Sequence, residues 1–289
     1  MAKTYNELYF YIRNALKEKE IESYAQEARI LLAAAGQKSK EELMRDMNLY
    51  VSDGVEDKVL HMLKRRLWGE PLAYVVGAWE FYGMPFIVNK DVLIPRMDTE
   101  VLVSAALELA DKEASKLRIL DLCCGSGCIA CAVAKNLPRA TVVAGDISDK
   151  ALDVCRENIT VSRLSTRVIP VHVDATKWAD ARVGVFDVII SNPPYIATDE
   201  IGTLDVSVKD YEPVSALDGG KDGLDFYHSI IKYWTVALRP SGLIMFEVGE
   251  NQADAVKQLL LDAGYVSVDS RLDTLGVERV VIGKWKNEY

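Results

Sequence analysis

The residues with the clearest chemical potential are Asn192-Pro193-Pro194-Tyr195, which directly follow the apolar run 188–190. Proline fixes φ and has no N–H group, so two successive prolines leave carbonyl oxygens without the partners of a regular strand or turn. The Asn192 side-chain oxygen beside such carbonyls makes a pair of acceptors for an –NH2 group. We predict that these four residues bind a planar amide or amino group, with Asn192, Pro193 and Tyr195 taking part in catalysis. A plain loop after a strand is the alternative.

A second candidate site is the glycine turn Gly125-Ser126-Gly127, which follows an expected strand at 118–122 and precedes an expected helix. Such a turn brings a ligand against backbone N–H groups and the N-terminus of a helix. Residues 125–130 also satisfy the G-x-G-x-x-G/A pattern of dinucleotide binding. The glycines alone do not distinguish a nicotinamide dinucleotide from another adenosine ligand.

The carboxylate of Asp121, at the end of the same strand, favours one of these ligands. It would repel a pyrophosphate, but it could help to hold the ammonium group of a methionine-like moiety. S-adenosyl-L-methionine carries a sulfonium, an ammonium and an adenosine. We therefore predict S-adenosyl-L-methionine as the cofactor, bound by Asp121 and by the turn from Cys123 and Cys124 onward.

Two further carboxylates end the next two expected strands. Asp146 is placed to bind the two hydroxyl groups of a ribose, and its alternative role is a helix N-cap with Ser148. Asp174 is placed to bind the adenine amino group, with a solvated loop residue as the alternative. The predicted cofactor site also includes the residues that follow them, Ile147 and Ala175.

The five cysteines, Cys123, Cys124, Cys128, Cys131 and Cys155, are crowded into a short stretch, which predicts reduced thiols and not a disulfide framework. The spacing of Cys124, Cys128 and Cys131 is similar to the cluster-binding triad of radical S-adenosylmethionine enzymes. Those enzymes usually have an aromatic residue before the third cysteine, whereas this chain has alanine. We favour buried core residues one helical turn apart, and we predict no metal.

The formal net charge of −9 is unevenly distributed along the chain. Of the 34 basic and 43 acidic side chains, residues 1–72 hold 12 of each, which leaves 22 basic against 31 acidic ones in residues 73–289. Binding to nucleic acid depends on Lys and Arg that neutralise phosphates. The acidic half therefore disfavours nucleic acid as the direct substrate.

No apolar run approaches the roughly 20 residues that span a bilayer. The first ten residues, MAKTYNELYF, are too polar for a signal peptide. We expect a cytoplasmic protein without a membrane segment.

The first seventy residues predict a helical unit, because three capping-box patterns each precede apolar residues at helical spacing. These patterns are Thr4 with Glu7, Ser23 with Gln26 and Ser39 with Glu42. Residues 74–95 change to β-branched and aromatic residues broken by Gly83 and Pro85, which predicts a β-hairpin between two domains.

From about residue 99 the pattern alternates between helices and strands, which predicts an α/β domain with a parallel sheet and helices on both faces. The expected strands are Arg118–Leu122, Thr141–Gly145, Val168–Val173, Val185–Ser191, Gly242–Val248, Tyr265–Ser270 and Arg279–Lys284. The last two are close enough to pair antiparallel.

Several further motifs accompany the Asn-Pro-Pro-Tyr segment. They are Gly69-Glu70-Pro71-Leu72-Ala73-Tyr74, Glu80-Phe81-Tyr82-Gly83, Leu93-Ile94-Pro95-Arg96, Asp98-Thr99-Glu100, Glu212-Pro213, Ala216-Leu217, Asp222-Gly223-Leu224 and Glu247-Val248-Gly249. Together they resemble the glutamine-N5 methyltransferases of bacterial peptide-chain release factors, the PrmC/HemK family, over essentially the whole chain.

The resemblance implies a Rossmann-like seven-stranded methyltransferase domain at 96–289, an N-terminal helical bundle at 1–72 that docks the partner, and a β-hairpin linker at 73–95. The implied reaction transfers a methyl group from S-adenosyl-L-methionine to the side-chain amide nitrogen (N5) of the glutamine in the Gly-Gly-Gln motif of release factors. We expect a monomer.

The resemblance also suggests roles for individual residues. Phe81 and Tyr195 would wall the glutamine, with core packing as the alternative. Arg96 and Thr99 would reach the carboxylate of the cofactor, although Arg96 could equally form a structural ion pair.

The chain departs from the family in its cofactor loop, where Cys123 and Cys124 replace a glycine and a threonine. If the first position needs a positive φ, Cys123 is strained there. Met97 replaces a frequent proline, and we expect little effect.

Three other functions compete with this interpretation. The nearest is methylation of an exocyclic amine of adenine or guanine in nucleic acid, which an Asn-Pro-Pro-Tyr segment also suits. A nicotinamide-dependent oxidoreductase would use the same glycine turn, but no hydride-transfer partner is evident. The third is a cofactor-binding protein without activity.

Overall fold

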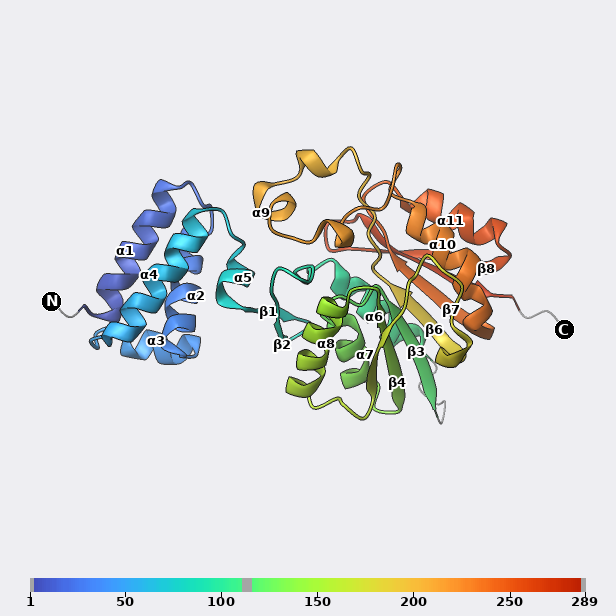
Figure 1. Cartoon of the computed structure of the whole chain (residues 1–289), viewed down its shortest axis with the longest axis horizontal. Coiled ribbons are helices and arrows are strands. Elements are labelled where there is room, and N and C mark those ends of the chain that lie inside the picture. The colour runs from blue at the N-terminus through green and yellow to red at the C-terminus, as the bar shows by residue number, and fades with distance from the viewer. Residues whose placement is uncertain (1–2, 111–115, 287–289) are drawn as a thin grey trace. The chain divides into compact units, whose positions relative to one another are not determined.

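The structure is a computed structural model that describes residues 3–110 and 116–286. The chain folds into two compact units (Figure 1). The helical unit comprises Met1–Ala78 with Val206–Tyr211, and the sheet unit comprises Trp79–Asp205 with Glu212–Tyr289. The functional division predicted at residues 72 and 95 stays a prediction.

The helical unit is a bundle around its own apolar core. Its helices are α1 (Tyr5–Glu18), α2 (Tyr24–Gly36), α3 (Lys40–Asp46), α4 (Asp53–Leu67) and α5 (Leu72–Val76), with the short α9 (Val206–Lys209) from later in the chain. Leu8, Ile12 and Leu16 recur at helical spacing along α1 and are fully buried. Leu31 and Leu32 of α2 are buried in the same core. The predicted helical N-terminal unit is therefore confirmed.

The capping boxes at Thr4 and Ser39 are both present, and each serine or threonine side chain accepts from the backbone N–H three residues later. The box predicted at Ser23 is wrong. Ser23 has ψ 20°, outside the extended region that an N-cap adopts, and its hydroxyl donates to Glu27 Oε1 at 3.0 Å. The Ser23 hydroxyl therefore bonds to the Glu27 carboxylate, one helical turn along, and not to a backbone N–H group.

The same Glu27 forms a buried ion pair across the bundle. Arg66 of α4 donates from Nε to Glu27 Oε2 at 2.7 Å and from Nη2 to Oε1 at 3.2 Å. The two side chains are only 16% and 8% exposed. This fork geometry ties α2 to α4 inside the helical unit.

Replacing Arg66 by Met should lower the free energy of unfolding by about 3 kcal/mol, because the buried Glu27 carboxylate then loses its cationic partner and keeps only the hydrogen bond from Ser23. Urea unfolding of the full chain, followed by circular dichroism, measures the change. The matched control is Arg45→Met, since Arg45 is 71% exposed and should matter little. Equal losses in the two variants would contradict the assignment. Adding Glu27→Leu to Arg66→Met should recover much of the loss.

The predicted hairpin is present but shorter than the sequence indicated. Strands β1 (Ala78–Phe81) and β2 (Met84–Ile87) pair in a two-stranded sheet, joined by Tyr82 and Gly83 with φ 50° and 68°. The first part of residues 74–95 instead belongs to α5, which Gly77 ends in the left-handed conformation. Val75 packs into the helical core, and this burial outweighs the β propensity of the segment.

All seven strands predicted for the second unit are present. They are β3 (Leu117–Leu122), β4 (Ala140–Asp146), β5 (Val168–His172), β6 (Phe186–Ser191), β7 (Leu238–Glu247), β8 (Tyr265–Leu272) and β9 (Glu278–Trp285). Their order in the sheet is β5-β4-β3-β6-β7-β9-β8. The first five are parallel, and β9 pairs antiparallel with both β7 and β8, as the sequence predicted.

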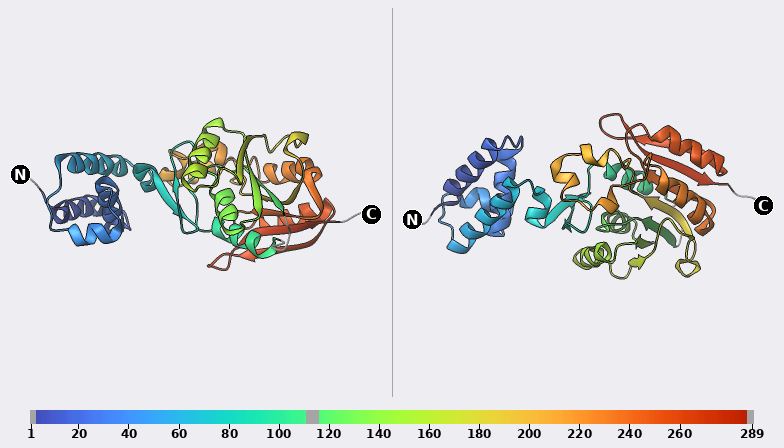
Figure 2. Two further views of the ribbon diagram at one scale, coloured as in Figure 1. Left: turned by 90° about the horizontal axis from the view of Figure 1, so that it is seen from below. Right: turned by 45° about the horizontal axis from the view of Figure 1, so that its top comes forward.

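Helices cover both faces of this sheet (Figures 1 and 2). Helices α6 (Thr99–Leu109), α7 (Cys128–Asn136) and α8 (Asp149–Val161) share one apolar core with the sheet, and α10 (Asp225–Trp234) and α11 (Ala253–Asp262) share the other. The chain runs outward from β3 to β5 and then returns to the opposite side of β3 with β6. The strand order thus reverses at β3, where ligands bind in open α/β sheets.

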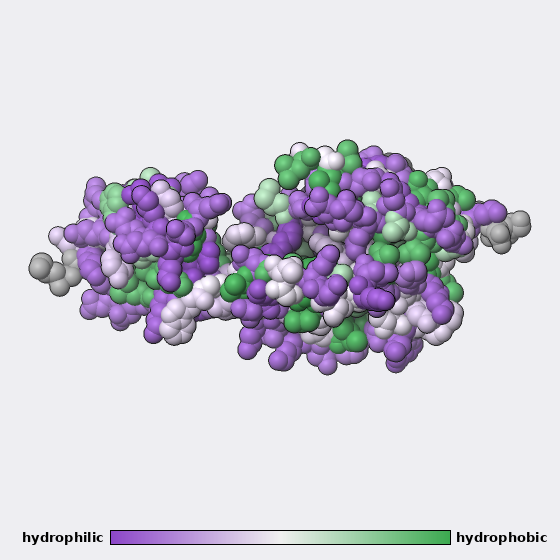
Figure 3. Space-filling model, turned by 90° about the horizontal axis from the view of Figure 1, so that it is seen from above, coloured by the Kyte–Doolittle hydropathy of each residue, from purple (hydrophilic) through white to green (hydrophobic). Residues whose placement is uncertain are grey.

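Hydrophilic residues cover most of the face drawn in Figure 3, interrupted by apolar patches. Exposed apolar side chains of the helical unit include Phe10, Tyr11, Tyr50 and Trp68. Within the described residues, no helix has the length and apolar character to cross a membrane.

Candidate active site at the carboxyl ends of the parallel strands

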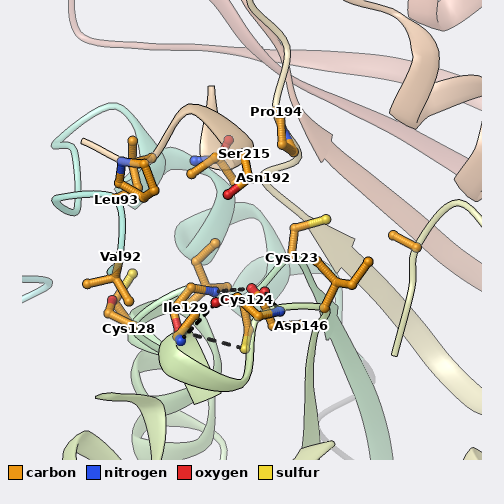
Figure 4. A pocket seen from close by; sticks show the side chains of 18 of the residues that line it. Val92, Leu93, Cys123, Cys124, Cys128, Ile129, Asp146, Asn192, Pro194 and Ser215 are labelled. Carbon is orange, nitrogen blue, oxygen red and sulfur yellow. Dashed lines mark hydrogen bonds between the residues drawn. The ribbon is translucent and has the colours of Figure 1, made fainter. Parts of the chain in front are cut away.

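A pocket lies in the sheet unit where β3, β4, β5 and β6 end. It encloses about 1080 Å³ of space free of atoms, part of it open to solvent. Figure 4 shows Leu93, Ser215, Asn192 and Pro194 on one side, with Cys123, Cys124 and Asp146 opposite. Most of the predicted cofactor residues line it: Arg96, Thr99, Cys123, Cys124, Gly125, Ser126, Asp146, Ile147, Asp174, Ala175 and Asn192. Separate strand ends therefore bring the predicted residues into one cavity.

The turn after β3 adopts left-handed backbone at three positions. Cys123 has φ 61°, Gly125 has φ 51° and Gly127 has φ 75°. A Cβ added to Gly125 would meet nothing within 4 Å, whereas a Cβ on Gly127 would lie 2.5 Å from the Cys155 sulfur. Gly125 thus leaves an open cradle beside the pocket, and Gly127 permits close packing against α8. Cys123 thus adopts the positive φ at which a residue with a Cβ is strained.

Because a Cβ is disfavoured at positive φ, Cys123→Gly should be more stable than Cys123→Ala by about 1 kcal/mol. Both variants lack the thiol, so the comparison isolates the backbone, and urea unfolding measures it. Cys131 lies inside α7, where the same pair should give the opposite order by a similar amount. An Ala variant at 123 as stable as the Gly variant would show that the turn carries no strain.

Asp146 fixes the turn as well as facing the pocket. Its Oδ2 accepts from Gly125 N and its Oδ1 from Ser148 N, each at 2.9 Å. Ser148, and not Asp146, is the N-cap of α8, since its hydroxyl accepts from Ala151 N at 3.2 Å. Burial raises the pKa of Asp146 while the backbone N–H groups act against that shift. A carboxylate has about four acceptor sites, so Asp146 retains capacity for ligand hydroxyl groups.

Asp121 lies beneath the turn and does not line the pocket. It is fully buried, and its Oδ2 accepts from Ala130 N of α7 at 3.0 Å. Its Oδ1 has no hydrogen-bond partner among the described residues. Burial raises the pKa of Asp121 to about 8. Near pH 7 the carboxyl group is therefore mostly protonated, and a cation bound nearby would favour its ionised form.

Asp174 follows β5 and lines the pocket. Its Oδ1 accepts from the backbone N of Thr176 at 2.8 Å and from the Thr176 hydroxyl at 2.6 Å. Both bonds use one oxygen, so the other stays available to an amino group. These bonds fix the direction of the side chain, and its role toward an adenine amino group stays a prediction.

Asn192 directly follows β6 and lines the same pocket. Its amide nitrogen donates to the Thr99 hydroxyl at 3.2 Å, at the start of α6. The buried carboxyl group of Glu247 lies near both side chains, and burial raises its pKa to about 7 while Thr99 and Asn192 oppose the rise. With its nitrogen committed to Thr99, the Asn192 oxygen remains as an acceptor.

Known proteins match both units of the chain. The family model of the Methyltransferase small domain matches residues 97–206, and that of the PrmC N-terminal domain matches residues 7–77. A release factor glutamine methyltransferase from Clostridium acetobutylicum is 37% identical over 269 residues, which cover 93% of this chain and 94% of that one. One from Geobacter sulfurreducens is 39% identical over 282 residues, covering 94% and 93%. The chain belongs to the release factor glutamine methyltransferase family. The resemblance found in the sequence is thereby confirmed.

The fold of this family member also occurs in a methyltransferase from Pyrococcus furiosus. The two structures have a TM-score of 0.54 at 18% identity, over 78% of this chain and 99% of that one. This likeness concerns the fold alone, and it agrees with the predicted Rossmann-like methyltransferase domain.

Arg96 forms a structural ion pair, which is one of the two roles that the sequence allowed for it. Its guanidinium donates to Glu212, whose other oxygen accepts from Ile94 N at 3.1 Å. Glu212 is buried, whereas Arg96 is half-buried and also lines the pocket. The ion pair holds the segment before α6 against the segment that follows Tyr211.

Not every residue expected to contact the substrate lines the pocket. Phe81 is 1% exposed and packs edge-on against Phe86 with ring centroids 6.1 Å apart, so it occupies the core position given as its alternative. Pro193 and Tyr195 also lie outside the lining, and Pro194 lies within it. Burial raises the pKa of Tyr195 to about 12.

The cysteines do not form the ligand set of a cluster. Within residues 3–110 and 116–286, no group of three His, Cys, Asp or Glu side chains could hold a metal ion. Cys128 and Cys131 lie in α7, one helical turn apart, and both are buried in the core. Burial raises the pKa of both thiols, which keeps them neutral.

Sequence reasoning missed part of the pocket wall. Val92, Leu93, Ile129, Ser215 and Phe226 line it without having been predicted. The motifs around Leu93 and Ser215 were visible in the sequence, but they lie far from the glycine turn along the chain. Only folding brings them together.

Proposed function

We propose that this chain transfers a methyl group from S-adenosyl-L-methionine to the N5 amide nitrogen of the glutamine in the Gly-Gly-Gln motif of peptide-chain release factors. The observation that carries the proposal is the orientation of the Asn192 carboxamide, which a hydrogen bond to Thr99 fixes. Its nitrogen donates to Thr99, which leaves its oxygen free to accept from an amide –NH2 group. The names of the relatives that match over most of the chain support the choice of substrate.

The residues of the pocket fit S-adenosyl-L-methionine, which supplies an electrophilic methyl group on a positively charged sulfur when it is bound. Asp146 would accept from the ribose hydroxyl groups, and Asp174 from the adenine amino group. The open space at Gly125 allows a ligand to approach the backbone closely. A bound cation would favour the ionised form of the buried Asp121 carboxyl group, whose Oδ1 is unpartnered, whereas a pyrophosphate would oppose its ionisation.

The substrate nitrogen needs help from the protein, because the lone pair of an amide is delocalised. Asn192 Oδ1 and the Pro193 carbonyl would each accept one hydrogen of the substrate –NH2 group. These two bonds orient the nitrogen and stabilise positive charge as it develops. Since Pro193 has a fixed φ and no N–H, its neighbourhood is stiff enough to keep both acceptors in place.

The helical unit would dock the protein partner. Its exposed aromatic side chains Phe10, Tyr11, Tyr50 and Trp68 are of the kind enriched at protein interfaces. The acidic balance of residues 73–289 disfavours a nucleic-acid substrate. The proposal retains the monomeric state and cytoplasmic location predicted from the sequence.

Asn192→Ala should keep cofactor affinity and lower methyl transfer on the order of 100-fold, because it removes one acceptor for the substrate nitrogen. Radiolabelled methyl transfer to a release factor measures the rate, and calorimetry measures cofactor binding. Asn136→Ala, at the far end of α7, is the matched control and should leave transfer unchanged. Wild-type activity in Asn192→Ala would sink the mechanism.

The substrate is tested with the same label in parallel reactions. Release factor, a release factor whose Gly-Gly-Gln glutamine is replaced by alanine, RNA and DNA are each offered to the wild-type chain. Label should enter only the first. Label in RNA or DNA alone would replace the proposed substrate with a nucleic-acid base.

Asp146→Ala should weaken cofactor binding roughly 10-fold to 100-fold, because the cofactor loses its hydrogen bonds to a charged acceptor. Calorimetric titration with S-adenosyl-L-methionine measures the dissociation constant. Asp149→Ala, three residues along and 80% exposed, should bind as the wild type does. Unchanged affinity in Asp146→Ala would remove this carboxylate from the site.

A further inference from the structure

Glu247 ends β7 beside the strand that carries Asn192. Strands β6 and β7 are parallel, with Ser191 in register with Phe246. The next residue along each chain segment, Asn192 just after β6 and Glu247 at the end of β7, therefore lies at the same edge of the sheet. Asn192 has a role in the proposed reaction, whereas Glu247 has none so far.

The carboxyl group of Glu247 is held in a fixed, dry position. The side chain is 2% exposed, and the backbone on either side is pinned. The Tyr227 hydroxyl donates to Glu247 O at 2.9 Å, and Val248 N donates to Arg279 O at 2.9 Å. Glu247 Oε2 has no hydrogen-bond partner within the described part of the chain. A buried acidic oxygen without a partner is costly, and structural packing alone does not account for it.

Thr99 connects this carboxylate to Asn192. Its hydroxyl oxygen accepts from Asn192 Nδ2 at 3.2 Å, and a hydroxyl has one hydrogen of its own to donate. Glu247 lies close enough for hydrogen bonding with Thr99 and Asn192 to favour its ionised form. Donation from Thr99 to Glu247 makes the Thr99 oxygen a better acceptor.

Two acceptors facing one carboxamide decide which way the carboxamide points. If Asn192 were flipped, its oxygen would face both the Thr99 oxygen and the Glu247 carboxylate, with no hydrogen between Asn192 and the carboxylate. The NH2 end must face them instead, which turns Oδ1 toward the substrate. Without Glu247, no electrostatic interaction would favour one orientation of the Asn192 carboxamide over the other.

We propose that Glu247 is a positioning residue that, with Thr99, fixes the Asn192 carboxamide with its oxygen toward the substrate nitrogen. The inference rests on the proposed function and assigns a role to a motif, Glu247-Val248-Gly249, that the reaction has not yet used. Glu247 does not touch the reacting atoms. It acts only through the orientation of Asn192.

The role depends on the charge of Glu247 and hence on pH. Asp98 and Arg279 face Glu247 with opposite effects on its pKa, and Tyr195, Tyr227 and Cys128 also interact with it. Burial is the largest influence and raises the pKa to about 7. Below that pH the protonated group is itself a donor, which can bond to Asn192 Oδ1 and hold the amide flipped. Activity should therefore rise with pH, with a midpoint at or below 7, because a bound cation lowers the pKa further.

The test compares Glu247→Gln with the wild type from pH 5 to pH 9, by label transfer to a release factor at saturating cofactor. The variant resembles the protonated state at every pH. Its kcat should fall on the order of 10-fold to 100-fold at pH 8, and its activity should no longer rise with pH. Cofactor affinity by calorimetry should stay unchanged, since the change affects orientation at the substrate side.

A second pair keeps the proposal testable if Glu247→Gln fails to fold. Thr99→Ser retains the hydroxyl and should keep the rise of activity with pH, whereas Thr99→Val should lose that rise. A folded Glu247→Gln variant with the wild-type rate and the wild-type rise of activity with pH would overturn the inference. Absence of transfer by the wild-type chain itself would instead overturn the proposed function, so the two failures are distinguishable.

Discussion

The site depends on the parallel pairing of β3 with β4 on one side and β6 on the other. In this pairing Asp121 stands opposite Ala144 and Ile190, so the strand ends that follow lie at one level. Parallel strands need crossover helices, and those helices begin at the same edge where the strands end. The glycine turn, Asp146 and Asn192 come together because of this geometry, and the hydrogen bond from Gly125 N to Asp146 Oδ2 adds a direct link between the turn and Asp146.

The second shared property of the site is its set of buried carboxyl groups. Burial raises the pKa values of Asp121, Asp146 and Glu247 alike, and none of the three forms an ion pair within the described residues. By contrast, Arg96 and Arg279 form direct ion pairs with Glu212 and Asp273. The carboxyl groups around the pocket can therefore bind ligands that are cationic or rich in hydrogen-bond donors.

The sequence predicted the elements well where the signal was local. The strands of the sheet unit are short apolar runs, and Asp146 and Asn192 could be placed because each ends such a run. The misses are contacts over long separations. Nothing in the local sequence links Thr99 to Asn192, and Phe81 reads equally as a substrate wall or a core residue until Phe86 packs on it. Likewise the residues of α5 have strand propensity, and only burial in the helical core makes them a helix.

The close approach of Gly127 to Cys155 constrains how this chain can evolve. A single added carbon at 127 would collide with the sulfur at 155, and that sulfur fills the space which the missing side chain leaves. Neither position can gain volume without a loss of volume at the other. Because one residue belongs to the ligand turn and the other to α8, substitutions that enlarge the helix core must be accompanied by a change in the loop. The packing of the turn against α8 therefore couples the residue choices at 127 and 155.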